Sequence, residues 1–238
     1  MRTYRLLAVT GLLAGLLFTA SAQAKKDVKK DQETAKKALA EVGDFVGQWN
    51  ASGEVAEGKK AIFKETLEIG WKFSKDGDAW MTLTVKDGKF LVSGDLKYLV
   101  EKKQYQLTAK DKAGKEVVFL GTLTKGKLLL ESKDATSGDV HKLIINTLAD
   151  GARMVVQADV QAKGKGLGTT VFKTSATKEG ESFAGGGKKN ECCVTGGLGT
   201  MAVNYNGKTY YVCCSGCRDE FNANPKKIVE DYEKKKGK

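Results

Sequence analysis

Histidine is almost missing from this sequence of 238 residues, which contains it once, at position 141. Acid–base catalysis by imidazole could therefore run only through His141, which falls in a predicted strand and has no evident partner. A serine–histidine–aspartate set, an HExxH zinc motif, a phosphate-binding loop and a dinucleotide-binding fingerprint are also missing. We expect His141 to be a structural residue, and the sequence predicts a protein that is not an enzyme.

Long apolar runs are missing as well, because the longest covers residues 6–20 and a membrane-spanning helix needs about twenty residues. Arg2 and Arg5 make a short positive start before this run, and small residues at the spacing that a signal peptidase recognises end at Ala24. This order is typical of a secretory signal peptide, residues 1–24. The sequence predicts an exported protein, periplasmic or extracellular, that does not span the membrane after cleavage.

The chain lacks a concentrated patch of charge, although its formal net charge is +11 at pH 7. A basic surface favours anionic partners such as polyanions and lipid headgroups. Here, however, the lysines are scattered along the chain and gather only near its two ends. Since no nucleic-acid-binding motif accompanies them, we interpret them as a solvated surface and expect no nucleic acid as a partner.

Cysteine does not occur before position 192 and then occurs five times, at positions 192, 193, 213, 214 and 217. Disulfide bonds are the usual state of cysteine in an exported protein. An odd number packed into one short segment fits that state poorly, because at least one thiol is left over. The clustering instead indicates that the functional site lies in this C-terminal segment.

Between residues 45 and 179 the apolar residues alternate with polar ones, as in Met81, Leu83 and Val85, which is typical of strands with one buried face. Turn signals such as Asp150-Gly151 separate these segments at short intervals. The segments number about nine or ten, and in one of them Phe90, Val92 and Leu96 fall on one face. We predict a mainly β fold, an up-and-down antiparallel β-barrel that hides its edges, with a two-sheet sandwich as the alternative.

The flanks of this β domain have a different composition. Residues 25–44 are charged and rich in alanine, and predict a short helical lead-in. Residues 180–190 are rich in glycine and predict a flexible linker. The first strand opens with Gly47 and Trp49, which resembles the Gly-x-Trp start of lipocalin-like barrels. This resemblance implies that the tryptophan plugs one end and that the barrel could carry a small apolar ligand.

The last segment, residues 191–238, predicts a small cysteine-rich α+β module. A tight turn at Cys192 precedes a β-hairpin with Asn206-Gly207 as its turn, and a helix then begins near Cys217. The hairpin folds the chain back, so a thiol before it can meet the thiols at its far end. Thiolates are preferred ligands of soft and borderline ions such as Cu(I) and Zn(II), and so small a module needs a metal or a disulfide to fold.

The module closely resembles the YHS/TRASH family of heavy-metal-binding modules, which have a treble-clef-like fold. The resemblance rests on the spacing of Cys192, Cys213 and Cys217 and on two flanking features, the Asn206-Gly207 turn and the Asn224-Pro225 pair. It implies that these three cysteines bind a heavy-metal ion, zinc or copper above all, for buffering, delivery or sensing. It also implies a metal-transport or metal-resistance protein as a partner.

Cys193 and Cys214 depart from the family pattern, which often has proline and serine at these positions, and the family's name-giving histidine is also missing. Either cysteine could complete a four-thiolate site, or the two could form a disulfide beside it. Three alternatives to metal capture stay open. The Cys214-x-x-Cys217 pair could be a thiol–disulfide redox centre, the barrel could be the functional part as a carrier, or disulfides could staple a structural surface protein.

Overall fold

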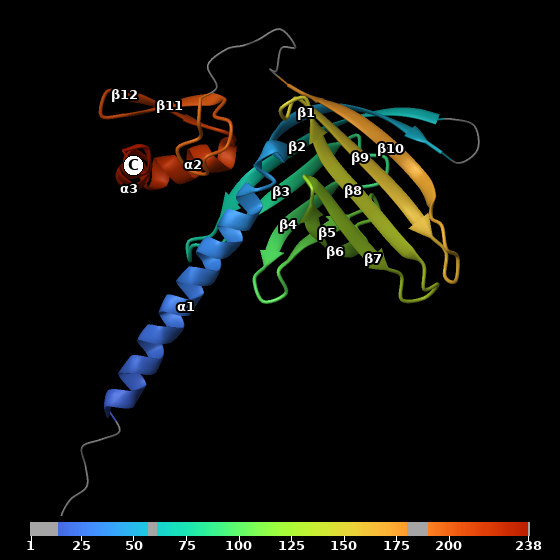
Figure 1. Ribbon diagram of the computed structural model, residues 1–238. Helices are drawn as coiled ribbons and strands as arrows, with labels where there is room; N and C mark the ends of the chain where they lie inside the picture. Colours follow the sequence, from blue (N-terminus) through green and yellow to red (C-terminus); the bar gives the residue numbers. More distant parts are fainter. Residues whose placement is uncertain (1–13, 57–60, 180–189, 238) are drawn as a thin grey trace, which may run out of the picture.

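The computed structural model describes residues 14–56, 61–179 and 190–237, which form a β-barrel, a long N-terminal helix and a small C-terminal module (Figure 1). Residues 1–13 of the predicted signal peptide and residues 180–189 of the predicted linker lie outside this described part. Within the described part, no helix combines the length and the apolar character needed to cross a membrane.

Ten antiparallel strands close into a barrel, in which each strand pairs with its neighbour in sequence and β1 pairs with β10. The predicted up-and-down barrel is confirmed, and the sandwich alternative is wrong. The strands are β1 (Gly47–Val55), β2 (Ala61–Phe73), β3 (Ala79–Lys86), β4 (Ser93–Leu99), β5 (Gln104–Lys110), β6 (Glu116–Thr124), β7 (Lys127–Lys133), β8 (Val140–Leu148), β9 (Arg153–Gln161) and β10 (Thr169–Lys178).

Most of the hairpin turns lie at the glycine-containing pairs that were predicted to form them. Asp150 and Gly151, for example, both have positive φ angles, 52° and 86°, between β8 and β9. Phe90 follows the alternation of this strand in the sequence but lies before it in the structure, where β4 begins at Ser93. The Phe90 ring leaves the strand pattern and stacks on Phe172, with 4.4 Å between ring centroids, so an aromatic contact replaces strand pairing at this position.

Trp49 is fully buried in β1 and occupies the place that the Gly-x-Trp resemblance implied. Its indole Nε1 donates a hydrogen bond of 2.8 Å to the carbonyl oxygen of Phe45, in the short 3-10 helix η1 (Gly43–Phe45). The Lys178 ammonium lies 4.8 Å from the centroid of the indole ring and donates to the Asp44 carbonyl at 2.9 Å. The tryptophan therefore ties the segment before β1 to the first and last strands of the barrel.

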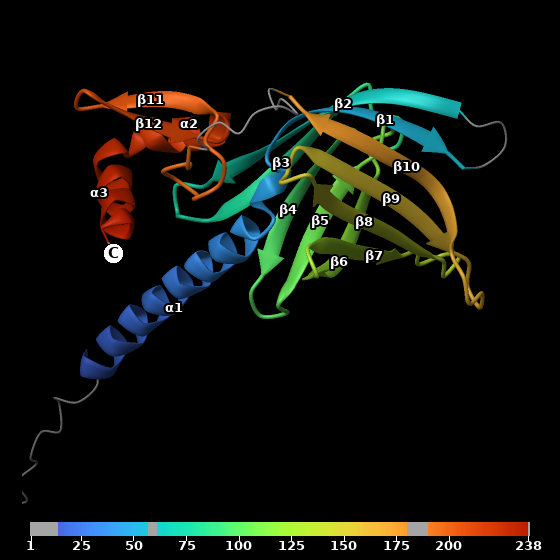
Figure 2. The ribbon, with the colours of Figure 1, turned by 45° about the horizontal axis from the view of Figure 1, so that its top comes forward.

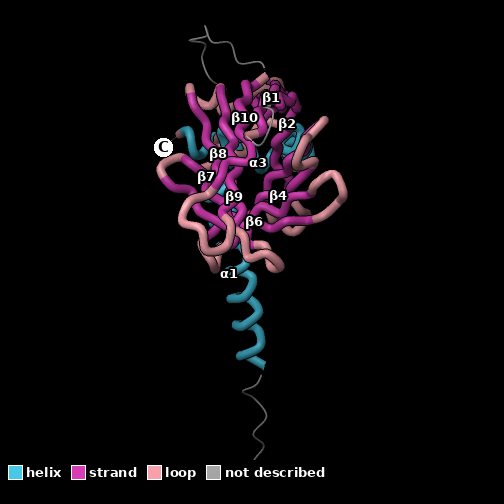
Figure 3. The backbone as a smooth tube through the Cα atoms, turned by 90° about the vertical axis from the view of Figure 1, so that its right-hand side faces the viewer, coloured by secondary structure: helices cyan, strands magenta, loops and turns pink. Residues whose placement is uncertain are grey.

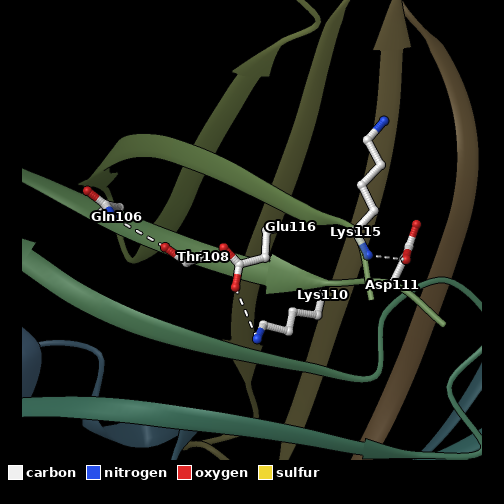
Figure 4. A network of polar contacts seen from close by, with 6 residues as sticks. All are labelled: Gln106, Thr108, Lys110, Asp111, Lys115 and Glu116. Carbon is white, nitrogen blue, oxygen red and sulfur yellow. Dashed lines mark hydrogen bonds and ion pairs between the residues drawn. The ribbon is translucent and has the colours of Figure 1, made fainter. Parts of the chain in front are cut away.

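The outer face of the barrel carries polar contacts between neighbouring residues of the β5–β6 hairpin (Figure 4). Gln106 donates to Thr108 at 3.2 Å, and Lys110 forms an ion pair with Glu116 at 3.0 Å. In the connecting turn, Asp111 accepts backbone N–H groups through its carboxylate. Such contacts among exposed groups contribute little stability and indicate a solvated surface, with the core lying inside the barrel.

The N-terminal helix α1 (Ala14–Ala40) starts well before the predicted lead-in and projects away from the barrel (Figures 1 and 3). Its last turn docks on the barrel, where Leu39 is fully buried. The Tyr105 hydroxyl of β5 donates a hydrogen bond of 2.7 Å to the carbonyl oxygen of Ala38, and burial raises the pKa of Tyr105 to about 12. The end of α1 is thus fixed to the barrel wall.

The C-terminal module contains the hairpin β11 (Met201–Tyr205) and β12 (Lys208–Val212), followed by α2 (Ser215–Ala223) and α3 (Pro225–Lys236). It lies beside β2, outside the barrel (Figure 2). The predicted Asn206-Gly207 turn is confirmed, since both residues have positive φ angles. Pro225 is the first residue of α3, and the Asn224 side chain donates to Glu220 and does not cap the helix.

Candidate metal centre

The turn that carries Cys192 lies alongside the end of the module hairpin. Cys192 forms an isolated parallel bridge with Tyr211 of β12, and the backbone N–H of Cys193 donates to the Tyr211 carbonyl at 2.9 Å. The turn is closed by a hydrogen bond of 2.8 Å from the Gly196 N–H to the Cys192 carbonyl. These backbone contacts place the first cysteine next to the residues that follow β12.

The three sulfur atoms of Cys192, Cys213 and Cys217 lie within 4.8 Å of one another. Cys213 directly follows β12, and Cys217 lies in the first turn of α2, so the hairpin and the helix start together bring them close. The sulfur atoms of Cys213 and Cys217 are 3.4 Å apart. Cys192 and Cys217 are completely buried, and Cys213 is 8% exposed, so the cluster is shielded from water.

The other two cysteines occupy different surroundings, and all five are free thiols. The Cys214 sulfur lies 3.9 Å from that of Cys213 and accepts a hydrogen bond of 3.3 Å from the Trp71 backbone N–H in β2. Cys193 is buried but stands outside the three-sulfur group, and burial, with the nearby Cys192 charge, raises the pKa of its thiol to about 11. His141 lies in β8 and pairs with strands of the barrel wall, away from the cysteines.

The thiols of the cluster differ in pKa. The pKa of Cys192 is lowered because the thiols of Cys213 and Cys217 hydrogen-bond to its sulfur, and the pKa of Cys217 is raised by the same contacts. Lys36 of α1 lies nearby, where burial lowers the pKa of its ammonium group and the charge on Cys217 opposes that change. Its nitrogen also lies 5.4 Å from the Phe73 ring centroid. A partly buried lysine side chain therefore lies near the cluster.

Helix α2 packs directly on strand β2, and Gly216 permits the close approach, whereas a side chain at Gly70 would make an ordinary contact. A Cβ atom at Gly216 would lie 1.7 Å from the Trp71 carbonyl oxygen, and one at Gly70 would lie 3.7 Å from the Cβ of Cys214. Trp71 itself is 2% exposed and, with Thr195, lines a void of about 10 Å³ beside Cys213. The barrel thus forms one wall of the thiol cluster, which the sequence did not predict.

Replacing Gly216 with alanine is expected to weaken this interface, because the added methyl group would overlap the Trp71 carbonyl. Forcing a methyl group into a well-packed contact costs about 1–3 kcal/mol. Chemical denaturation of the full chain would measure the loss, and limited proteolysis would report whether the module is released. Gly197→Ala is a matched control in the same module, since its Cβ would meet no atom closer than 3.8 Å. Equal stability of the two variants would contradict the proposed packing.

A second candidate site lies inside the barrel, where a cavity of about 100 Å³ is lined by side chains from most of the strands. Its lining is almost entirely apolar and includes Met81, Met154 and Phe172. Three residues with polar side chains, Glu65, Thr82 and Thr174, complete the wall. The barrel interior is therefore not completely filled by its own side chains, and the cavity could hold a small molecule.

The sequence matches no known family model and no curated protein. Among solved structures, Rv2717c from M. tuberculosis is 17% identical, with 60% of this chain and 97% of that chain covered and a TM-score of 0.38. The S-type phycobiliprotein lyase CPES from Guillardia theta is 11% identical, with 65% and 98% covered and a TM-score of 0.36. At these scores neither match carries information about function or ligand.

Proposed function

We propose that this protein captures a heavy-metal ion through the thiolates of Cys192, Cys213 and Cys217. The observation that carries the proposal is the convergence of three sulfur atoms, far apart in the sequence, to within 4.8 Å of one another in a buried position. Metal ligation gives a physical reason for such a convergence, because three buried thiols offer one another only weak hydrogen bonds. The resemblance of the cysteine spacing to YHS/TRASH modules points in the same direction.

The donor set selects the class of metal. Thiolates favour Cu(I) and Zn(II) over hard ions such as Mg²⁺ and Ca²⁺, which prefer oxygen ligands. Zn²⁺ is almost always four-coordinate in structural sites. Cys193 and Cys214 both stand outside the three-sulfur group, but the Cys214 sulfur is 3.9 Å from that of Cys213, which makes Cys214 the better candidate for a fourth ligand.

The surroundings of the cluster favour binding over catalysis. No histidine or carboxylate belongs to the three-sulfur group, and the small void beside Cys213 is lined by Trp71, Thr195 and small residues. Lys36 would offset part of the negative charge that three thiolates keep after binding one ion. We infer a protein that is not an enzyme and that buffers, delivers or senses the metal after export, with a metal-transport or metal-resistance protein as its partner.

Native mass spectrometry of the full chain, purified under reducing and oxygen-free conditions and then given one equivalent of Zn²⁺ or Cu(I), tests the proposal. One ion per chain is expected, together with protection of Cys192, Cys213 and Cys217 from alkylation. A second sample, purified without reductant, reports the native state of the cysteines: a metal-free chain lighter by two hydrogens for each disulfide would support the stapled structural protein instead. A readily reversible Cys214–Cys217 disulfide with a reduction potential in the catalytic range would support the redox alternative.

A second function, carriage of a small apolar ligand, is supported by the cavity of about 100 Å³ within the barrel. It does not depend on the metal site, because the cavity is lined by barrel strands and the cysteines belong to the module. Met81 and Met154 lie in the cavity wall, so their methyl resonances are local reporters. A shift of both signals on addition of benzene is the expected result for a carrier.

A further inference from the structure

Thr174 is an unusual member of the cavity wall. It lies on β10 between Phe172 and Ala176, whose side chains face the same cavity, and it is 2% exposed. Its hydroxyl oxygen has no hydrogen-bond partner in the part of the chain that the structure describes. Buried hydroxyl groups are normally hydrogen-bonded, because leaving water without a new partner is unfavourable. The Thr174 hydroxyl is therefore suited to form a hydrogen bond with a molecule bound in the cavity.

The other polar side chains of the wall are already engaged. The Thr82 hydroxyl donates to the Gly70 carbonyl, at 3.4 Å. Glu65 accepts the Lys89 backbone N–H at 3.3 Å, and burial raises the pKa of its carboxyl group. Of these three side chains in the part of the chain that the structure describes, Thr174 is thus the one whose polar atom has no partner at all.

The charge of the lining limits the ligand further. No lysine, arginine or histidine is among the described residues that line the cavity, so a carboxylate or phosphate would find no counter-charge there. The one acidic residue, Glu65, supplies no positive charge to such a group either. The cavity, about 100 Å³, is somewhat smaller than the roughly 150 Å³ apolar cavity that accepts benzene in another protein. These features favour a small uncharged molecule over a fatty acid.

We propose that the barrel cavity binds a small uncharged molecule with an apolar body and a single hydroxyl or carbonyl group, which forms a hydrogen bond with the Thr174 hydroxyl. The proposal rests on the second function above, ligand carriage by the barrel, and adds the chemical class of the ligand and the residue that orients it. The apolar body would contact Met81, Met154 and their neighbours.

The test compares phenol with benzene as probes, on the full chain with ¹³C-methyl-labelled methionine. Met81 and Met154 report the cavity, and Met201 of β11 reports the metal module, where no shift is expected. Thr174→Val keeps the shape of the side chain and removes the hydroxyl group. We expect this variant to bind phenol about three- to tenfold more weakly, which is the usual effect of one hydrogen bond, and to bind benzene as well as before.

Thr177→Val is the matched control, because Thr177 lies on the same strand but faces the outside of the barrel. It should leave the affinities for both probes unchanged, and benzoate should not bind to any of the three proteins. If neither phenol nor benzene shifts the cavity methyl groups, ligand carriage itself is wrong. If both bind but Thr174→Val weakens phenol no more than benzene, carriage stands and the role of Thr174 is overturned. Binding of benzoate as strong as that of phenol would overturn the uncharged class.

Discussion

Replacing Cys217 with serine is expected to lower the affinity for Zn²⁺ and Cu(I) by more than about 100-fold, since loss of even an outer-shell partner of a metal costs 10- to 100-fold. Cys217 is fully buried, and its sulfur lies 3.4 Å from that of Cys213. A serine hydroxyl is a poor ligand for either ion and keeps its proton at neutral pH. Competition with a chromophoric chelator would measure the affinity of the full chain.

Cys193→Ser provides the control for this experiment. Cys193 is as buried as its neighbours but does not belong to the three-sulfur group, so its replacement should leave the affinity almost unchanged. Circular dichroism of both variants would show that each is folded. An equal loss of affinity in the two variants would contradict the assignment of the ligands, and unchanged affinity in Cys217→Ser would remove the basis of the proposed function.

Replacing Trp49 with alanine is expected to lower the free energy of unfolding by about 3–5 kcal/mol, the usual cost of truncating a large buried aromatic residue. The change removes a fully buried indole, its hydrogen bond to Phe45 and the contact with the Lys178 ammonium. Guanidinium denaturation followed by far-ultraviolet circular dichroism would measure the effect on the barrel.

Trp80→Ala is the matched control, because Trp80 belongs to β3 of the same barrel but is only half-buried, with Lys97 over its ring. Its replacement should cost clearly less than that of Trp49. If the two variants lose the same stability, then Trp49 does not have the special role at the end of the barrel that its contacts indicate.

The barrel could be predicted from the sequence because its signals are local. Met81, Leu83 and Val85 alternate within one strand, and pairs such as Asp150-Gly151 favour the turn conformation whatever surrounds them. Phe90 escaped prediction for the opposite reason. Its position is decided by Phe172, a residue far along the chain, and no local pattern contains that information.

The same distinction applies to the candidate metal centre. The three cysteines could be grouped from their spacing, because a hairpin and a helix start fix their geometry locally. Trp71 and Lys36 could not be assigned to the site, because they reach it through packing between separate elements. Gly216 was visible between two cysteines, but only the structure reveals the carbonyl group against which it packs.

Strand β2 belongs to both halves of the molecule, since Leu67 and Ile69 face the barrel cavity while Gly70 and Trp71 adjoin the cysteine-rich module. A shortened protein ending after β10 would uncover the Trp71 backbone and the surface that α2 now covers. Such a fragment would lose the packing of α2 on β2 and is expected to be less stable than the full chain. The two halves are therefore best regarded as one unit for cloning, storage and engineering.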